Sequence, residues 1–497
     1  MKNILLASCL FAATALSTSC SNFLDVKPTH AADKDESVTT AADAQVIIRG
    51  LMSKMASGSY YGRNFMLYGD VKGGDFTITS QGRGYDYLYV FNHSPQSNSY
   101  SAIWDQAYHC IAQINNLLTQ IQKIKDNGST ENFDQYIGQA LTARALIYFD
   151  LVRLYGEPYN ENKEALGVPI TLEVLNYNAK LGRNTVSENY VQILKDLKDA
   201  EPLLSKTNSN GYLNYYANKA IQARVYLFQD DFENALSNAE TIINSNAYSL
   251  YTNANWVNSW GTQFGTESIF ELAILPSEGD LGNTSLGAYY RRRGHPNATI
   301  AAGYFTASTN FIDLLNEDTE DIRKGIMSYD EVSNTRLGAL YKYSGSTDVS
   351  TTTGKGDGKG NTTAINIKVI RLSEVYLIAA EAALRSNTSD RTKAAGYLQQ
   401  IRKRSPNLTP ATSSTINLDM IADERSKELL GEGHRFFDMM RWNRVIDFDD
   451  DLGSVPHTHR DKQIDRTFYK TILPISQDEG NANPVIKGQQ NPGYTNN

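Results

Sequence analysis

Apolar residues recur at intervals of three and four along much of this chain, the spacing typical of amphipathic helices. Residues 100–124 carry one such stripe, formed by Ile103, Ala107, Ile111, Ile114, Leu117, Leu118 and Ile121. Residues 135–155 carry a second stripe, which stops at Gly156 with Pro158 two places later, a typical helix end. The pattern predicts a pair of long helices over about residues 100–155, preceded by a helix over residues 37–57.

Two further stretches, about residues 186–245 and 365–446, repeat the helical spacing. Each is interrupted by a short polar break, near residues 230–231 in the first and near residues 389–390 in the second. Alanines on their apolar faces allow close helix contact, as in tetratricopeptide repeats. No regular 34-residue period can be laid down, so a generic helical bundle remains open. We therefore expect a mainly α protein, an α-helical bundle with tetratricopeptide-like helix pairs.

Two regions depart from this pattern and are expected to be rich in loops, about residues 60–95 and 250–363. The first interleaves six glycines with six tyrosines, and the second is rich in Gly, Ser, Thr and Asn with a strand-like piece at residues 268–274. Its segment 351–363 has few apolar residues and is expected to be a mobile tip. Since loops on a rigid scaffold commonly carry binding residues, a ligand site is expected in these regions.

Residues 421–442 form the densest mixture of charge and large apolar side chains. They are expected to form two helical segments joined at residues 431–433. Charges among so many apolar neighbours must be paired, because an unpaired buried charge is costly. Arg–carboxylate pairs are therefore predicted within a set of six: Glu424, Glu428, Glu432, Arg435, Asp438 and Arg441.

The first residues have the composition of a secretory leader. Lys2 precedes an apolar run over residues 4–16 and then small residues, which end at Cys20. We predict a lipoprotein signal peptide at residues 1–19 and lipidation of Cys20. No later stretch has the roughly 20 apolar residues that a membrane helix needs, so the mature protein is expected to be anchored rather than spanning.

The net charge and the tyrosine content bear on which class of ligand the protein could bind. The 497 residues carry a net charge of −8 and no long basic run, which makes nucleic acid an unfavoured partner. The chain has 30 Tyr and 17 Phe. Tyrosine combines an apolar face with a polar tip, which suits sugar surfaces as well as ordinary half-buried packing.

No motif argues for catalysis, a cofactor or a metal. The sequence lacks H-E-x-x-H, G-x-S-x-G and the phosphate-binding G-x-x-x-x-G-K-[ST]. Glu424, Glu428, His434 and Asp438 invite a metal interpretation, but their spacing favours structural ion pairs. We expect neither an enzyme nor a metal site.

Four segments together resemble the SusD/RagB family of nutrient-binding surface lipoproteins. Residues 424–442 read E-R-x-x-E-L-x-x-E-G-H-R-x-x-D-x-x-R-W, and residues 20–28 read C-x-x-F-L-D-x-x-P. Residues 104–115 read W-x-x-x-Y-x-x-I-x-x-x-N, and residues 473–494 resemble the family's terminal segment. The resemblance implies a SusD-like domain over residues 20–497, located at the cell outer membrane. It also implies a SusC-like TonB-dependent transporter as partner.

The resemblance supplies no ligand residues, so candidates come from loop context. Aromatic rings would stack on sugars while Asp and Arg orient hydroxyls. The candidates are Tyr60, Tyr61, Asp75, Arg83, Tyr85, Tyr87, Trp256, Trp260, Tyr289 and Tyr290. Glycan is the expected ligand. A RagB-like peptide binder, a surface hydrolase and a pure interaction scaffold remain as alternatives.

Overall fold

A computed structural model describes residues 38–96, 100–176, 178–274, 281–293, 300–343 and 364–495. The predicted signal peptide, Cys20 and the predicted tip at residues 351–363 lie outside these ranges, so the expectations about them stay predictions.

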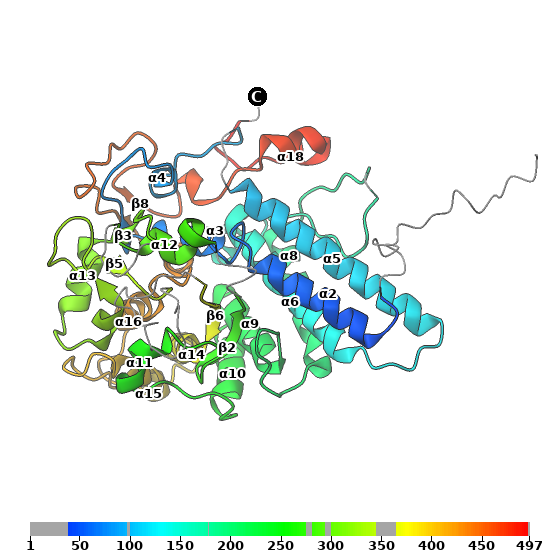
Figure 1. Ribbon diagram of the computed structural model, residues 1–497, viewed down its shortest axis with the longest axis horizontal. Helices are drawn as coiled ribbons and strands as arrows, with labels where there is room; N and C mark the ends of the chain where they lie inside the picture. Colours follow the sequence, from blue (N-terminus) through cyan, green and yellow to red (C-terminus); the bar gives the residue numbers. More distant parts are fainter. Residues whose placement is uncertain are drawn as a thin grey trace, which may run out of the picture.

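One half of the molecule is a layer of long helices, which lie side by side at the right of Figure 1. They are α2 (Ala41–Met55), α5 (Ser101–Asp126), α6 (Asp134–Tyr155) and α8 (Val186–Ala200). Helix α6 packs against α5, α8 and α2, and its residues from Gly138 to Tyr155 are almost all buried. Capping boxes begin two of these helices, with Thr40 and Asp43 at α2 and Thr185 and Glu188 at α8. The expected mainly α fold is confirmed.

Two helical hairpins continue the layer and meet each other. Helices α9 (Tyr215–Phe228) and α10 (Phe232–Ile243) form the first, and α14 (Leu372–Arg385) and α15 (Arg391–Arg402) form the second. Helix α10 packs on both α9 and α14. The chain turns at Asp230 and Ser389, whose φ angles are +58° and +35°. These are the two breaks that the sequence pattern predicts.

The other half, at the left of Figure 1, is built from short elements. Four two-stranded antiparallel sheets pair β1 (Phe76–Thr77) with β3 (Thr306–Ala307), β2 (Ser268–Leu272) with β6 (Ile367–Arg371), β4 (Met327–Ser328) with β5 (Ala339–Leu340), and β7 (Ile446–Asp447) with β8 (Gln463–Ile464). The remaining helices are α3 (Asn64–Val71), α4 (Asp86–Tyr89), α7 (Tyr159–Asn162), α11 (Asn253–Ser259), α12 (Leu286–Tyr290), α13 (Thr309–Asn316), α16 (Leu418–Leu429), α17 (Arg435–Arg441), α18 (Gln477–Ala482) and α19 (Pro484–Lys487), with 3₁₀ turns η2 (Glu201–Leu203), η3 (Gly282–Thr284), η4 (Ile322–Ile326) and η5 (Tyr469–Thr471). Since Phe76 pairs with Ala307, the β1–β3 sheet joins the two regions that were expected to be loop-rich.

Residues 60–95 are more regular than the sequence suggests, because they include helices α3 and α4. Helix α3 is buried over residues 65–71, so it has no polar stripe to reveal it. It lies directly on the turn between α16 and α17. A Cβ built on Gly69 would stand 2.2 Å from the carbonyl oxygen of Gly433, so only glycine fits there.

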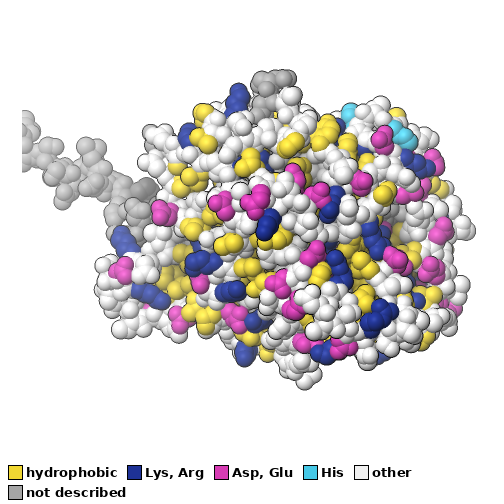
Figure 2. Space-filling model, turned by 180° about the vertical axis from the view of Figure 1, so that it is seen from behind, with side chains coloured by type: hydrophobic (Ala, Val, Ile, Leu, Met, Phe, Trp, Pro, Cys, Tyr) yellow, Lys and Arg dark blue, Asp and Glu magenta, His cyan; other side chains and the backbone are white. Residues whose placement is uncertain are grey.

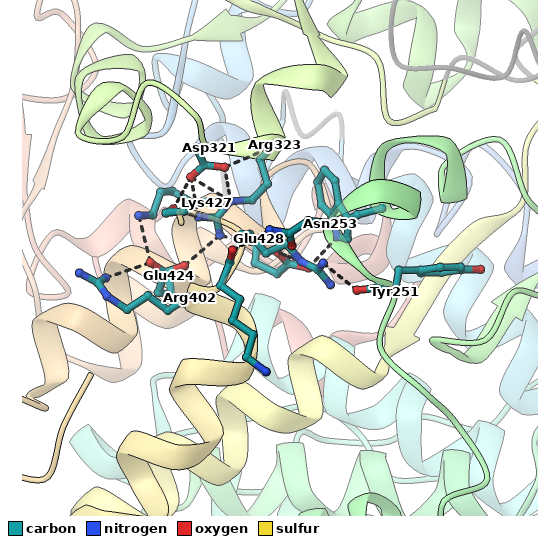
Figure 3. A network of polar contacts seen from close by, with 12 residues as sticks. Tyr251, Asn253, Asp321, Arg323, Arg402, Glu424, Lys427 and Glu428 are labelled. Atoms are coloured by element: carbon teal, nitrogen blue, oxygen red, sulfur yellow. Dashed lines mark hydrogen bonds and ion pairs between the residues drawn. The ribbon is translucent and has the colours of Figure 1, made fainter. Parts of the chain in front are cut away.

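A buried network of ion pairs fixes α16 to its surroundings (Figure 3). Arg323 lies 2.7 Å from Asp321 and 2.9 Å from Glu424, and Arg402 and Lys427 each lie 3.0 Å from Glu424. The predicted pairing of the charges in residues 421–442 is confirmed. Several of the partners come from outside that stretch.

The network continues toward the β2–β6 sheet and α17. Arg371 lies 2.7 Å from Glu432 and 3.2 Å from Glu428, and Arg441 lies 2.6 Å from Glu381. Burial raises the pKa of Glu428, but Arg404 and Arg371 outweigh burial and lower its pKa to about 2. These carboxylates are therefore ionised and bonded at neutral pH.

The surface seen from behind carries both signs of charge, interspersed with small apolar groups (Figure 2). No helix within the described ranges is long and apolar enough to cross a bilayer.

Candidate functional site

Four tyrosine rings from the two loop-rich regions lie next to one another, and we call them the Tyr85 cluster: Tyr85, Tyr87, Tyr289 and Tyr304. The centroid of Tyr85 lies 4.6 Å from that of Tyr289, 5.0 Å from Tyr304 and 5.7 Å from Tyr87. Tyr289 and Tyr304 are 4.7 Å apart. Helix α12 supplies Tyr289, and the N-terminal end of α4 supplies Tyr85.

Two arginines border the Tyr85 cluster. The guanidinium carbon of Arg63 lies 5.7 Å from the ring centre of Tyr85 and 5.4 Å from that of Tyr289, within cation–π range. Arg83 lies 5.2 Å from the Tyr304 ring and donates to the carbonyl oxygens of Ala302 and Gly303. Arg83 also pairs with Glu331 at 3.4 Å. These contacts place both cations beside the rings.

The rings differ in how much surface they offer. Tyr85, Tyr87 and Tyr304 are half-buried, whereas Tyr289 is 1% exposed and packs against Tyr85 and Tyr304. Burial raises the pKa of the Tyr289 phenol, so this hydroxyl remains a hydrogen-bond donor at neutral pH. The arrangement offers partly open aromatic faces with arginine donors at their edge, which suits stacking and hydrogen bonding rather than bond cleavage.

The structure places Tyr60 and Tyr61 in the core. Both phenols donate to Asp150 of α6, at 2.5 Å and 2.7 Å, and their side chains are fully enclosed. They have no free face on which a sugar could stack. Their expected role as ligand contacts is therefore not carried forward.

Four other candidates are also buried in the structure and do not offer a surface to a ligand. Trp256 and Trp260 are 0% and 2% exposed, and Trp256 donates its indole N–H to Glu428 at 3.1 Å, so it belongs to the ion-pair network. Tyr290 stacks on Phe76 with ring centres 4.7 Å apart. Asp75 accepts a hydrogen bond from the Ser426 hydroxyl at 2.7 Å and is 3.2 Å from Arg435.

Of the ten sequence candidates, the structure brings together Arg83, Tyr85, Tyr87 and Tyr289. It adds Tyr304 and Arg63, which loop context did not single out. No local motif marks either residue, because their segments meet only in the folded chain, through the pairing of β1 with β3 and hydrogen bonds such as that from Arg63 to the Thr284 carbonyl oxygen. Among the described residues no group of three or more His, Cys, Asp or Glu could hold a metal ion.

Comparison of the chain with known protein families finds two matches, which together cover most of its length. Residues 176–494 match the SusD family, and residues 22–227 match a family described as "Starch-binding associating with outer membrane". The chain belongs to the SusD family. The resemblance seen in the sequence is therefore confirmed.

Solved structures of SusD relatives share the whole fold. A SusD superfamily protein from Bacteroides thetaiotaomicron is 34% identical with a TM-score of 0.81, over 91% of this chain and all of the other. A putative sugar-binding protein from Bacteroides vulgatus is 33% identical with a TM-score of 0.80, over 92% of this chain and all of the other. A laminarin-binding SusD-like protein has a TM-score of 0.69 at 24% identity, over 91% of this chain and 99% of the other, and so shows the same fold.

A curated relative, SusD-like protein P2 from Formosa agariphila, is 25% identical over 92% of this chain and 93% of its own length. The two chains of this SusD-family pair therefore align along nearly their full lengths.

Proposed function

We propose that this SusD-family protein captures glycan at the cell surface through the Tyr85 cluster and passes it uncleaved to a SusC-like TonB-dependent transporter. The observation that carries the proposal is the convergence of three half-buried tyrosine rings with Arg63 and Arg83 at their edge.

The mechanism follows from the chemistry of a sugar ring. Its C–H faces are apolar and pack on aromatic rings, while its hydroxyls need hydrogen-bond partners. Tyr85 and Tyr304 would provide the stacking faces. Their phenols and the Arg63 guanidinium would hydrogen-bond the hydroxyls that surround the stacked ring.

The relatives support the ligand class without naming the glycan. One solved relative is described as a putative sugar-binding protein and another binds laminarin.

Binding is tested by affinity gel electrophoresis of the wild-type protein against a panel of polysaccharides. With the retarding polysaccharide identified, Tyr85→Ala and Tyr304→Ala should each weaken binding about tenfold, because a ring contact is worth roughly 1 kcal/mol or more. Tyr329→Ala is the matched control, since Tyr329 is 45% exposed and lies outside the Tyr85 cluster. Equal retardation of all three variants would contradict the proposed site, and shortened polysaccharide products would contradict uncleaved transfer.

The proposed location rests on lipidation of Cys20, with the family description mentioning association with the outer membrane as further support. Cys20→Ala should release the protein from the membrane fraction, because acyl chains are the proposed anchor. The measurement is immunoblotting of membrane and soluble fractions, with Cys110→Ala as control because Cys110 is buried in α5. Retention of the Cys20 variant in the membrane fraction would contradict the lipid anchor.

A further inference from the structure

An open groove of about 420 Å³ lies between the start of α5, residues 169–181 and α18. It shares no lining residue with the Tyr85 cluster. Its aromatic floor is formed by Trp104 and Tyr108, whose ring centres are 4.7 Å apart.

Hydrogen bonds hold the walls of this groove in place. Tyr108 donates its hydroxyl to the carbonyl oxygen of Pro169 at 2.8 Å. On the other side, Asn483 donates to Leu181 at 2.8 Å and Lys180 donates to Ala482 at 2.7 Å, which ties residues 180–181 to the end of α18. The groove is therefore preformed.

Its charged side chains are mostly acidic. Asp105 and Glu479 line the groove, and Asp478 lies next to Glu479. Within the described ranges none of the three forms an ion pair. Burial raises the pKa of Asp105, and repulsion from Asp478 raises it further. Burial also raises the pKa of Glu479 and outweighs the opposing effects of hydrogen bonds from Trp104 and Asn483 and of the Lys180 charge. A cation placed between these carboxylates would relieve that repulsion.

The rim is unusually apolar. Across the described residues ten large hydrophobic side chains are exposed. Leu175 lines the groove, and three more lie within three residues of a lining residue along the chain: Leu172, Val174 and Val485, and all four are 43% to 48% exposed. A Val485 methyl group lies 3.3 Å from the position that a Cβ on Gly182 would occupy, and Gly182 directly follows the lining residue Leu181. Exposed apolar groups concentrated in one place mark protein contact surfaces.

We propose that this groove binds a polypeptide segment of a partner protein, with a Lys or Arg between Asp105 and Glu479 and apolar side chains on Leu175 and its neighbours. The cation would lie against the rings of Trp104 and Tyr108. The charge of the segment is complementary to the three carboxylates, and its apolar side chains match the rim.

The backbone beside the groove favours a polypeptide over a sugar. The amide N–H groups of residues 172–175 donate to no backbone carbonyl within the described part of the chain. An extended segment could use them for main-chain hydrogen bonds, as in strand addition. A neutral glycan would leave Asp105 beside Asp478 without a counter-charge and would match the apolar rim poorly.

The test uses the full chain and a short fluorescein-labelled peptide of alternating leucine and lysine, measured by fluorescence anisotropy. Two control peptides replace lysine with glutamate or leucine with glycine. Wild-type protein should bind the Leu–Lys peptide and lose affinity as salt rises. Asp105→Asn combined with Glu479→Gln should weaken binding about tenfold, and Leu175→Ser should weaken it at least about threefold.

The matched control is Asp313→Asn, an exposed carboxylate on α13 outside the groove, which should bind as wild type does. Melting temperatures of all variants show whether each is folded. No binding of the Leu–Lys peptide, equal binding of the Leu–Glu peptide, or unchanged binding by the groove variants would overturn the proposal.

The same assay separates this groove from the glycan site. Tyr85→Ala should leave peptide binding unchanged, and the groove variants should leave polysaccharide retardation unchanged. Displacement of the peptide by the polysaccharide would show that the groove is a glycan subsite, and would also overturn the proposal.

Discussion

At the scale of single residues, burial separates the tyrosines that can meet a ligand from those that cannot. Glycine- and tyrosine-rich sequence suggests exposed loops, yet Tyr60 bonds to Asp150, a residue 90 positions away. Nothing near Tyr60 in the sequence reveals that partner. The sequence therefore located the region of the Tyr85 cluster through Tyr85, Tyr87 and Arg83, but could not select its members, because selection depends on contacts between distant segments.

Asp70 offers a residue-scale prediction. Its carboxylate accepts the N–H of Gly433 at 2.5 Å, but burial dominates and raises its pKa from 3.8 to about 8. A carboxyl group with a raised folded-state pKa binds its proton more tightly when folded, so its contribution to stability is lost as pH rises through about 8. The wild-type melting temperature should fall as pH rises from about 4 to about 8, and Asp70→Asn should reduce that fall by a few degrees. An identical pH dependence in the variant would show that Asp70 titrates normally.

At the scale of elements, periodicity predicted the long helices and both turns at Asp230 and Ser389. It failed at α3, because a short helix buried on all sides has no alternation of apolar and polar positions. The position of α3 is set instead by its close approach to the turn after α16. That approach depends on Gly69 and on Gly433, whose φ is +80°.

A pair of alanine substitutions tests the contact of α3. Gly69→Ala should destabilise the protein by about 2–4 kcal/mol, since its Cβ would collide with backbone that cannot move aside. Gly50→Ala on α2 has nothing within 4 Å of its Cβ and should be neutral or stabilising by up to about 1 kcal/mol. Denaturant unfolding measures both. Equal effects of the two substitutions would contradict the close approach.

At the scale of the whole molecule, the buried ion pairs join the helical layer to the half built from short elements. The charges of residues 421–442 were predicted to be paired, but three major partners, Arg323, Arg371 and Arg404, lie elsewhere in the chain. Such partners cannot be assigned from spacing along one stretch. Figure 3 shows Arg323 and Arg402, which come from two different segments, on either side of Glu424 in α16.

The network predicts sensitivity to acid. Glu428→Gln should cost about 3–5 kcal/mol, because it leaves Arg371 and Arg404 without a full counter-charge in the core. Asp419→Asn, which loses an exposed pair with Arg444, should cost less than about 1 kcal/mol. Since the pKa of Glu428 is lowered to about 2, its contribution is present above its unfolded pKa and lost as pH falls from about 4.5 to 2. The free energy of unfolding of the wild-type protein should therefore fall as pH drops from about 4.5 to 2, and it should fall less in Glu428→Gln. The same pH dependence in both proteins would contradict this role of Glu428.

The last described residues return to the first helical pair. Asn491 donates to the carbonyl oxygens of Tyr155 and Leu473, and Arg183 donates to that of Gln489. The end of α6 thus obtains one of its bonding partners from a segment made more than three hundred residues later. The Tyr155 carbonyl oxygen has a second donor in Arg183, so loss of Asn491 would remove one of two hydrogen bonds at this helix end. Detachment of the segment around Asn491 would expose the carbonyl oxygens of Tyr155 and Leu473 to water, and local opening of this kind makes the backbone more susceptible to proteolysis.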